Sequence, residues 1–268
     1  MGPPAVNARR GAAEASPGPN THYLFGTGPH KVLVLHGWFG DAHAFAPMEP
    51  ALTRDEFTYA FIDYRGYGGM FGAGGAFTID EIAADTLALA DHLGFREFSL
   101  IGHSMGGMAV QRVLTMAPER IRKMVALTPV PASGVPFDEA GWELFSGAAD
   151  KADHRYAIID YTTGNRLSRA WIDHMVAYSL AHASRDAFAA YLDAWSKTDF
   201  SASVQGLTLP VKVIVGEHDP ALNSSVMQAT FLASYPRCEL EVMANAGHYP
   251  MHETPVALAS SIENFLRR

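Results

Sequence analysis

The chain has 268 residues, a formal net charge of −8 from 28 acidic and 20 basic residues, and one cysteine. This length suits one large domain, or one domain with an insertion, while the single cysteine excludes an internal disulfide and no Cys/His cluster has zinc-ligand spacing. The acidic balance argues against nucleic acid or an anionic membrane surface as partner. No apolar run resembles a membrane span or signal peptide, so we expect a cytoplasmic protein. We also expect no metal and no cofactor.

In chain order, residues 1–20 are rich in Ala, Gly and Pro, which predicts a disordered tail. Strand patterns between loops, most of them apolar runs, then predict strands at residues 21–25, 31–35, 57–62, 98–101, 123–128, 211–215 and 239–243. Thr78 and Glu81 form a capping box that starts a helix ending before Gly94. This alternation of strands and helices predicts an α/β fold with a mostly parallel central sheet covered by helices on both faces.

The alternation stops between residues 131 and 206. This segment has no strand pattern, and its periodicity predicts helices at residues 137–145, 152–161, 167–180 and 185–195. We therefore predict a helical cap at 131–206, inserted into a core formed by 21–130 and 207–268.

The stretch Gly102-His103-Ser104-Met105-Gly106-Gly107 lies between a predicted strand and an amphipathic helical run. A serine flanked by glycines in such a turn is typical of a nucleophile elbow, in which the backbone of the serine is forced toward positive φ. The alternative is an ordinary Gly-rich turn with a capping serine.

A serine hydroxyl becomes a good nucleophile when an imidazole, itself held by a carboxylate, takes its proton. Ser104, Asp219 and His248 each follow a predicted strand and stand in the order Ser, Asp, His. Asp63 is the alternative acid, although we expect it to anchor the neighbouring loop. The other candidates are histidines: we expect structural roles for His36 and His103 and exposure for His218, and Pro250 argues against a helical metal pair of His248 and His252.

The chain resembles the α/β-hydrolase fold family from about residue 21 to 268. The resemblance rests on His36-Gly37, the elbow, Gly216-Glu217-His218-Asp219 and Gly247-His248. It is similar to small bacterial esterases and to cofactor-free haloperoxidases and perhydrolases, although Phe39 replaces a common proline of the latter and only one strand, instead of two, is visible before His36. The resemblance implies catalytic roles for Ser104, Asp219 and His248, and an oxyanion hole at the amides of Trp38 and Met105. Serine at 104 argues against the haloalkane dehalogenases and epoxide hydrolases, which use aspartate.

The substrate pocket is expected between these loops and the cap. Its candidate lining residues are Trp38, Phe39, Met105, Val130, Trp142, Phe145, Tyr178 and Trp195. Because the loops contain no cluster of Arg or Lys, we expect an uncharged, fairly apolar ester or lactone. The alternatives are perhydrolysis or halide oxidation through a peracid, cleavage of a carbon–carbon bond in a diketone, and a ligand receptor with little turnover. A homodimer formed through the cap is left open.

Overall fold

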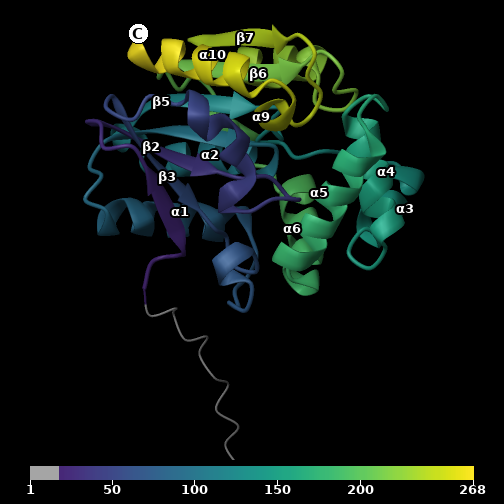
Figure 1. Cartoon of the computed structure of the whole chain (residues 1–268). Coiled ribbons are helices and arrows are strands. Elements are labelled where there is room, and N and C mark those ends of the chain that lie inside the picture. The colour runs from purple at the N-terminus through teal and green to yellow at the C-terminus, as the bar shows by residue number, and fades with distance from the viewer. Residues whose placement is uncertain (1–17) are drawn as a thin grey trace, which may run out of the picture.

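A seven-stranded sheet forms the centre of the computed structural model, which describes residues 18–268 (Figure 1). The strands are β1 (His22–Phe25), β2 (His30–Leu35), β3 (Phe57–Ile62), β4 (Phe98–His103), β5 (Ile121–Leu127), β6 (Val211–Gly216) and β7 (Cys238–Met243). They lie in the order β1-β3-β2-β4-β5-β6-β7. Only the β1–β3 pair is antiparallel among these neighbours. The predicted α/β class and mostly parallel sheet are confirmed.

Three of the strands are buried along their whole length because helices cover the sheet. Every residue of β3, β4 and β6 is buried, as the continuous apolar runs predict for a sheet covered on both faces. The covering helices are α1 (Ile79–His92), α2 (Met105–Met116) and α10 (Pro255–Arg267). α1 packs against α2, and α10 packs against a 3₁₀ helix at Ala42–Ala51 that the sequence pattern did not predict.

The predicted capping box at α1 is confirmed in one half only. The Thr78 hydroxyl accepts a hydrogen bond from the Glu81 amide at 3.1 Å. The Glu81 carboxylate does not return to Thr78 but accepts from the amides of Ala76 and Phe77, at 3.0 and 2.7 Å. Phe77 has a φ of 53°, which turns the preceding chain so that its amides face this carboxylate.

Five helices lie between β5 and β6, and we call them the inserted helices. They are α3 (Glu139–Gly147), α4 (Ala152–Thr162), α5 (Arg169–His182), α6 (Arg185–Lys197) and the short α7 (Ser201–Val204). Figure 1 shows α3 to α6 grouped together to one side of the sheet. Four of the five match predicted helices to within a few residues at each end. Two further short helices, α8 (Ser224–Met227) and α9 (Pro250–Glu253), follow β6 and β7.

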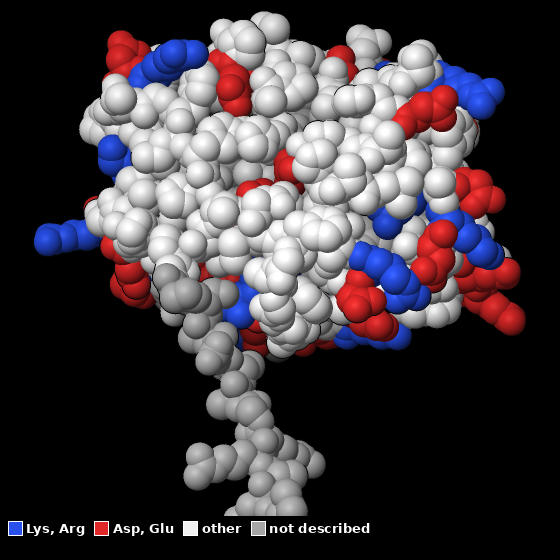
Figure 2. All heavy atoms as spheres, turned by 60° about the horizontal axis from the view of Figure 1, so that its bottom comes forward, with Lys and Arg blue, Asp and Glu red and all other residues white. Residues whose placement is uncertain are grey.

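The sequence predicts a tail up to residue 20, whereas the structure describes the chain from residue 18. Residues 1–17 of the predicted disordered tail lie outside the described residues, whereas Asn20 is buried and its side chain donates to the Asp63 main-chain oxygen at 2.9 Å. Within residues 18–268, no helix is long and apolar enough to cross a membrane. On the face drawn in Figure 2, charged side chains gather toward the edges and the centre is largely uncharged.

Candidate active site

The turn between β4 and α2 holds Ser104 in a strained conformation. Its backbone has φ 55° and ψ −115°, a region that L-residues adopt only where the surroundings enforce it. A β-carbon added to Gly102 would lie 2.2 Å from the Gly106 oxygen, and one added to Gly106 would lie 2.4 Å from the Leu35 oxygen. Both flanking positions therefore require glycine, as the elbow motif predicts.

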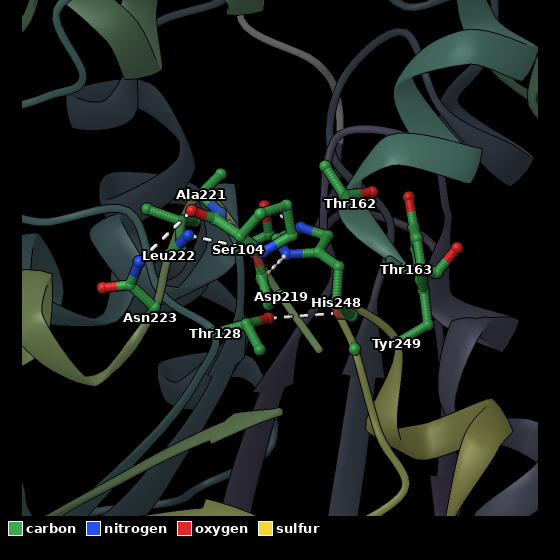
Figure 3. A network of polar contacts seen from close by, with 12 residues as sticks. Ser104, Thr128, Thr162, Thr163, Asp219, Ala221, Leu222, Asn223, His248 and Tyr249 are labelled. Atoms are coloured by element: carbon green, nitrogen blue, oxygen red, sulfur yellow. Dashed lines mark hydrogen bonds and ion pairs between the residues drawn. The ribbon is translucent and has the colours of Figure 1, made fainter. Parts of the chain in front are cut away.

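Ser104, His248 and Asp219 come together at the carboxyl ends of β4, β6 and β7 (Figure 3). Nδ1 of His248 lies 2.7 Å from Oδ2 of Asp219. A carboxylate only accepts hydrogen bonds, so Nδ1 carries the hydrogen and Nε2 is left to accept from the Ser104 hydroxyl at 3.0 Å. The arrangement allows the imidazole to take the hydroxyl proton while the carboxylate stabilises the resulting imidazolium.

Asp219 is fixed by the main chain of its own loop. It is 2% exposed, and its Oδ1 accepts from the amides of Ala221 and Leu222 at 2.9 and 3.1 Å. The second oxygen is thereby turned toward His248. Asp63, the alternative acid, accepts instead from the amides of Ala42 and Gly69 and from Thr21. Its side chain anchors loops, as we expected, and does not hold His248.

The rival histidines have structural surroundings. Burial, followed by proximity to His248, lowers the pKa of His103 well below its usual value, and its Nε2 lies 2.7 Å from the His248 carbonyl oxygen. Because the neutral ring donates there, His103 fixes the main chain of His248. His36 is also buried, which lowers its pKa, and it bonds the Gly37 carbonyl at 2.8 Å. Of the rival histidines named from the sequence, His218 is the exposed one, with 40% of its side chain accessible.

The loop after β2 is held by its carbonyl groups. The hydroxyls of Tyr64 and Tyr67 donate to the carbonyls of His36 and Trp38 at 2.7 and 2.8 Å. The Gly37 carbonyl accepts a hydrogen bond from His36 Nδ1. The Trp38 N–H shares a peptide with the Gly37 carbonyl, and in a trans peptide the N–H points opposite to the C=O, so the Trp38 amide points away from the His36 ring.

The same loop lies beside the elbow. A β-carbon on Gly37 would lie 3.3 Å from the Ser104 β-carbon. Met105 is the first residue of α2, and the helix N-terminus leaves its amide without an intrahelical acceptor. Among residues 18–268, neither the Met105 nor the Trp38 amide has a backbone acceptor. Both can therefore donate to an oxygen bound near Ser104.

A cavity of about 840 Å³ adjoins Ser104 and His248 and extends toward the inserted helices. Of the predicted lining residues, it is lined by Trp38, Phe39, Val130, Phe145, Tyr178 and Trp195. Met105 is fully buried beneath the elbow and contributes no wall.

The prediction for Trp142 is wrong. Its ring packs under the Lys197 ammonium, 4.1 Å from the ring centroid, and it does not line the cavity. Ala140, Gly141, Leu144 and Phe145 of α3 line the cavity from one face of the helix. At 100° per residue, Trp142 lies roughly 130° from the centre of that face. Trp142 and Phe145 are three positions apart in the sequence, and this spacing alone does not determine which of the two rings faces the cavity.

Sequence reasoning missed three histidines that also line the cavity: His43, His174 and His252. Burial lowers the pKa of His252 to about 4, so its ring is neutral near pH 7. No periodic pattern marks His43, because it belongs to the unpredicted 3₁₀ helix. Within the described residues, no group of three or more His, Cys, Asp or Glu is arranged to hold a metal ion.

Comparison with known proteins places this site in context. Residues 32–261 match the family described as "Alpha/beta hydrolase family". The 3-oxoadipate enol-lactonase 2 of Acinetobacter baylyi is 25% identical over 254 residues, which cover 91% of both proteins. The bromoperoxidase from Bacillus anthracis and the esterase EaEST from Exiguobacterium antarcticum, at 19% and 17% identity, each have a TM-score of 0.81 and cover 92% of this chain and 95% of theirs. These structures share its fold.

Proposed function

The chain belongs to the alpha/beta hydrolase family, and we propose that it is a cofactor-free serine hydrolase of carboxylic esters or lactones. One observation carries the proposal: Ser104 Oγ lies 3.0 Å from His248 Nε2, whose Nδ1 lies 2.7 Å from Asp219. This is the geometry required of a nucleophile, its base and the acid that orients the base. The enol-lactonase relative supports including lactones in the substrate class.

In the proposed reaction, Ser104 Oγ attacks the carbonyl carbon while His248 Nε2 takes its proton. The main-chain amides of Met105 and Trp38 donate to the oxyanion, and the loss of one such donor costs about 3–4 kcal/mol of transition-state stabilisation. Collapse of this intermediate breaks the ester C–O bond, and His248 returns the proton to the leaving oxygen. Water, deprotonated by His248, then attacks the acyl-enzyme, the bond between the acyl carbon and Ser104 Oγ breaks, and His248 returns the proton to Oγ. In a lactone the leaving alcohol stays attached to the released acid.

The cavity supports an uncharged, fairly apolar substrate. Among the described residues that line it, none is Lys or Arg, and the one carboxylate, Asp138, is occupied as the N-cap of α3. A carboxylate or phosphate on the substrate would find no permanent cation with which to pair. The wall near Ser104 is aromatic. The Phe145 ring stacks parallel to the Trp38 ring with 6.0 Å between ring centroids, and the Trp195 ring meets Trp38 edge-on with 5.5 Å between centroids. We assign the inserted helices the role of a cap that encloses this substrate.

The proposal is tested with a fluorophosphonate probe and a panel of p-nitrophenyl esters and lactones. The parent chain should be labelled and should hydrolyse the esters, whereas Ser104→Ala should do neither while melting as the parent does. Persistent labelling of Ser104→Ala would reject the nucleophile. A parallel assay with hydrogen peroxide reports perhydrolysis, and ligand-induced stabilisation without turnover would identify a receptor instead.

A further inference from the structure

We propose that Arg166 and Glu253 are positioning residues for His248, so that the inserted helices hold the proposed base in place. This inference rests on the proposed function, because that function assigns His248 as the base. Neither Arg166 nor Glu253 lines the cavity, so both would act on the reaction through the main chain of His248.

Glu253 holds the main chain on both sides of His248. It lies on α9, and its side chain is 3% exposed. Both carboxylate oxygens accept from the Gly247 amide at 2.9 Å, and Oε2 also accepts from the Tyr249 amide at 3.0 Å. Charge-assisted hydrogen bonds of this kind are stronger than neutral ones. One buried carboxylate therefore fixes the main chain one residue before and one residue after His248.

The amide of His248 itself is held by the inserted helices. It donates to the Thr162 carbonyl at the end of α4, at 3.1 Å. Gly247 packs so closely against the same turn that an added β-carbon would lie 2.7 Å from the Thr163 α-carbon. Figure 3 shows Thr162 and Thr163 next to His248, although Thr162 and His248 are 86 positions apart in the sequence. The base is thus assembled from two distant segments.

Arg166 joins these two segments. It follows α4, and its guanidinium forms an ion pair with Glu253. It also donates to the Thr163 carbonyl at 3.1 Å and to the Asn245 carbonyl, in the loop before His248, at 2.7 Å. Without Arg166, Glu253 would remain as a buried charge lacking its cation, and its carboxylate would be drawn toward water or protonated. Either change loosens its hold on Gly247 and Tyr249.

A second buried acid in this chain provides a matched control. Glu263 on α10 has a side-chain exposure of 4%, pairs with Arg267 at 3.0 Å and accepts from the Thr53 amide at 2.7 Å. It therefore resembles Glu253 in burial, in its arginine partner and in its bond to a backbone amide. Its contacts, which include the Tyr59 hydroxyl, are with residues outside the site.

The experiment compares the full-length parent with Arg166→Ala, Arg166→Lys, Glu253→Gln and the control Glu263→Gln. Four quantities are measured: kcat and KM for p-nitrophenyl acetate, the rate of fluorophosphonate labelling, and the low-field proton NMR resonance of the His248 Nδ1–H. Melting temperatures report overall stability. The small acetyl group limits contact of the substrate with the inserted helices, so changes in those contacts contribute little.

Arg166→Ala and Glu253→Gln should lower kcat and the labelling rate by up to about a hundredfold, as expected for a base displaced by an ångström, with KM near the parent value. The Nδ1–H resonance should shift or broaden, and Arg166→Lys should recover part of the activity because it keeps the charge. Glu263→Gln should lose stability but keep the parent kcat and resonance.

Parent-like kcat and an unmoved resonance in Arg166→Ala would overturn the inference, as would an equal loss of kcat in Glu263→Gln. Arg166 is partly exposed, so Arg166→Ala decides the matter if Glu253→Gln fails to fold. The proposed function fails separately, when the parent chain itself does not label.

Discussion

The substitution Gly106→Ala tests whether close approach of the backbone positions the elbow. The added β-carbon would lie 2.4 Å from the Leu35 oxygen and 2.6 Å from the His36 oxygen, about 1 Å short of ordinary contact, which begins at 3.4 Å. Both atoms belong to the main chain, so neither can rotate away. The start of α2 must move away from β2, and Met105 and Ser104 must move with it.

A displacement of this size has two measurable costs. Overpacking should lower the free energy of unfolding by about 1–3 kcal/mol, and moving Ser104 and the Met105 amide by an ångström should reduce kcat/KM for p-nitrophenyl acetate about a hundredfold. Gly74→Ala is the control, because nothing lies within 4 Å of its added β-carbon. A Gly106→Ala protein that melts and turns over as the parent does would refute the reasoning.

Three further substitutions give distinct expected outcomes. In Asp219→Asn the side-chain oxygen keeps its hydrogen bonds from the two backbone amides, so the NH₂ group faces His248 Nδ1. His248 then carries its hydrogen on Nε2, which can no longer accept the Ser104 proton. We expect kcat to fall about 10⁴-fold, and a mild loss would reassign the acid. Phe145→Ala should raise KM for an aryl ester, whereas Trp142→Ala should leave it unchanged, since only the first ring lines the cavity; equal KM values in steady-state assays would contradict this. Burial lowers the pKa of His252 to about 4, so between pH of about 6.5 and about 4 the unfolded chain takes up a proton that the folded chain does not. The free energy of unfolding should therefore fall by about 3 kcal/mol over this range. Urea titrations of His252→Asn should show a smaller fall with pH, and a fall equal to that of the parent would exclude His252 as its source.

The sequence predicted the strands because most of them, such as Phe57–Ile62 and Val211–Gly216, are largely apolar runs between glycine-rich or proline-rich loops. The elbow was predictable for a similar local reason: Gly102 and Gly106 stand at fixed offsets from Ser104. Such signals lie within a few residues and reflect backbone sterics and burial, which are properties of short segments.

The remaining features depend on contacts between distant segments. The 3₁₀ helix at Ala42–Ala51 contains two prolines and lacks an apolar period, so no pattern marked it. Trp142 and Phe145 are both apolar and close in sequence, and only the docking of α3 decides which one lines the cavity. Arg166 and Glu253 are separated by 87 positions, and neither has a local signature. Their pairing is visible only in three dimensions.

The anchoring of three successive carbonyls after β2 has a consequence for the energetics of turnover. Two phenols and one imidazole fix the peptide planes of residues 36–38, so these planes cannot flip as negative charge grows on a substrate. In water, solvent dipoles would have to reorient at that moment. In the proposed reaction, the dipole of the Gly37–Trp38 peptide is already oriented when the chain folds, so the reorganisation energy is met during folding and is not added to the activation barrier.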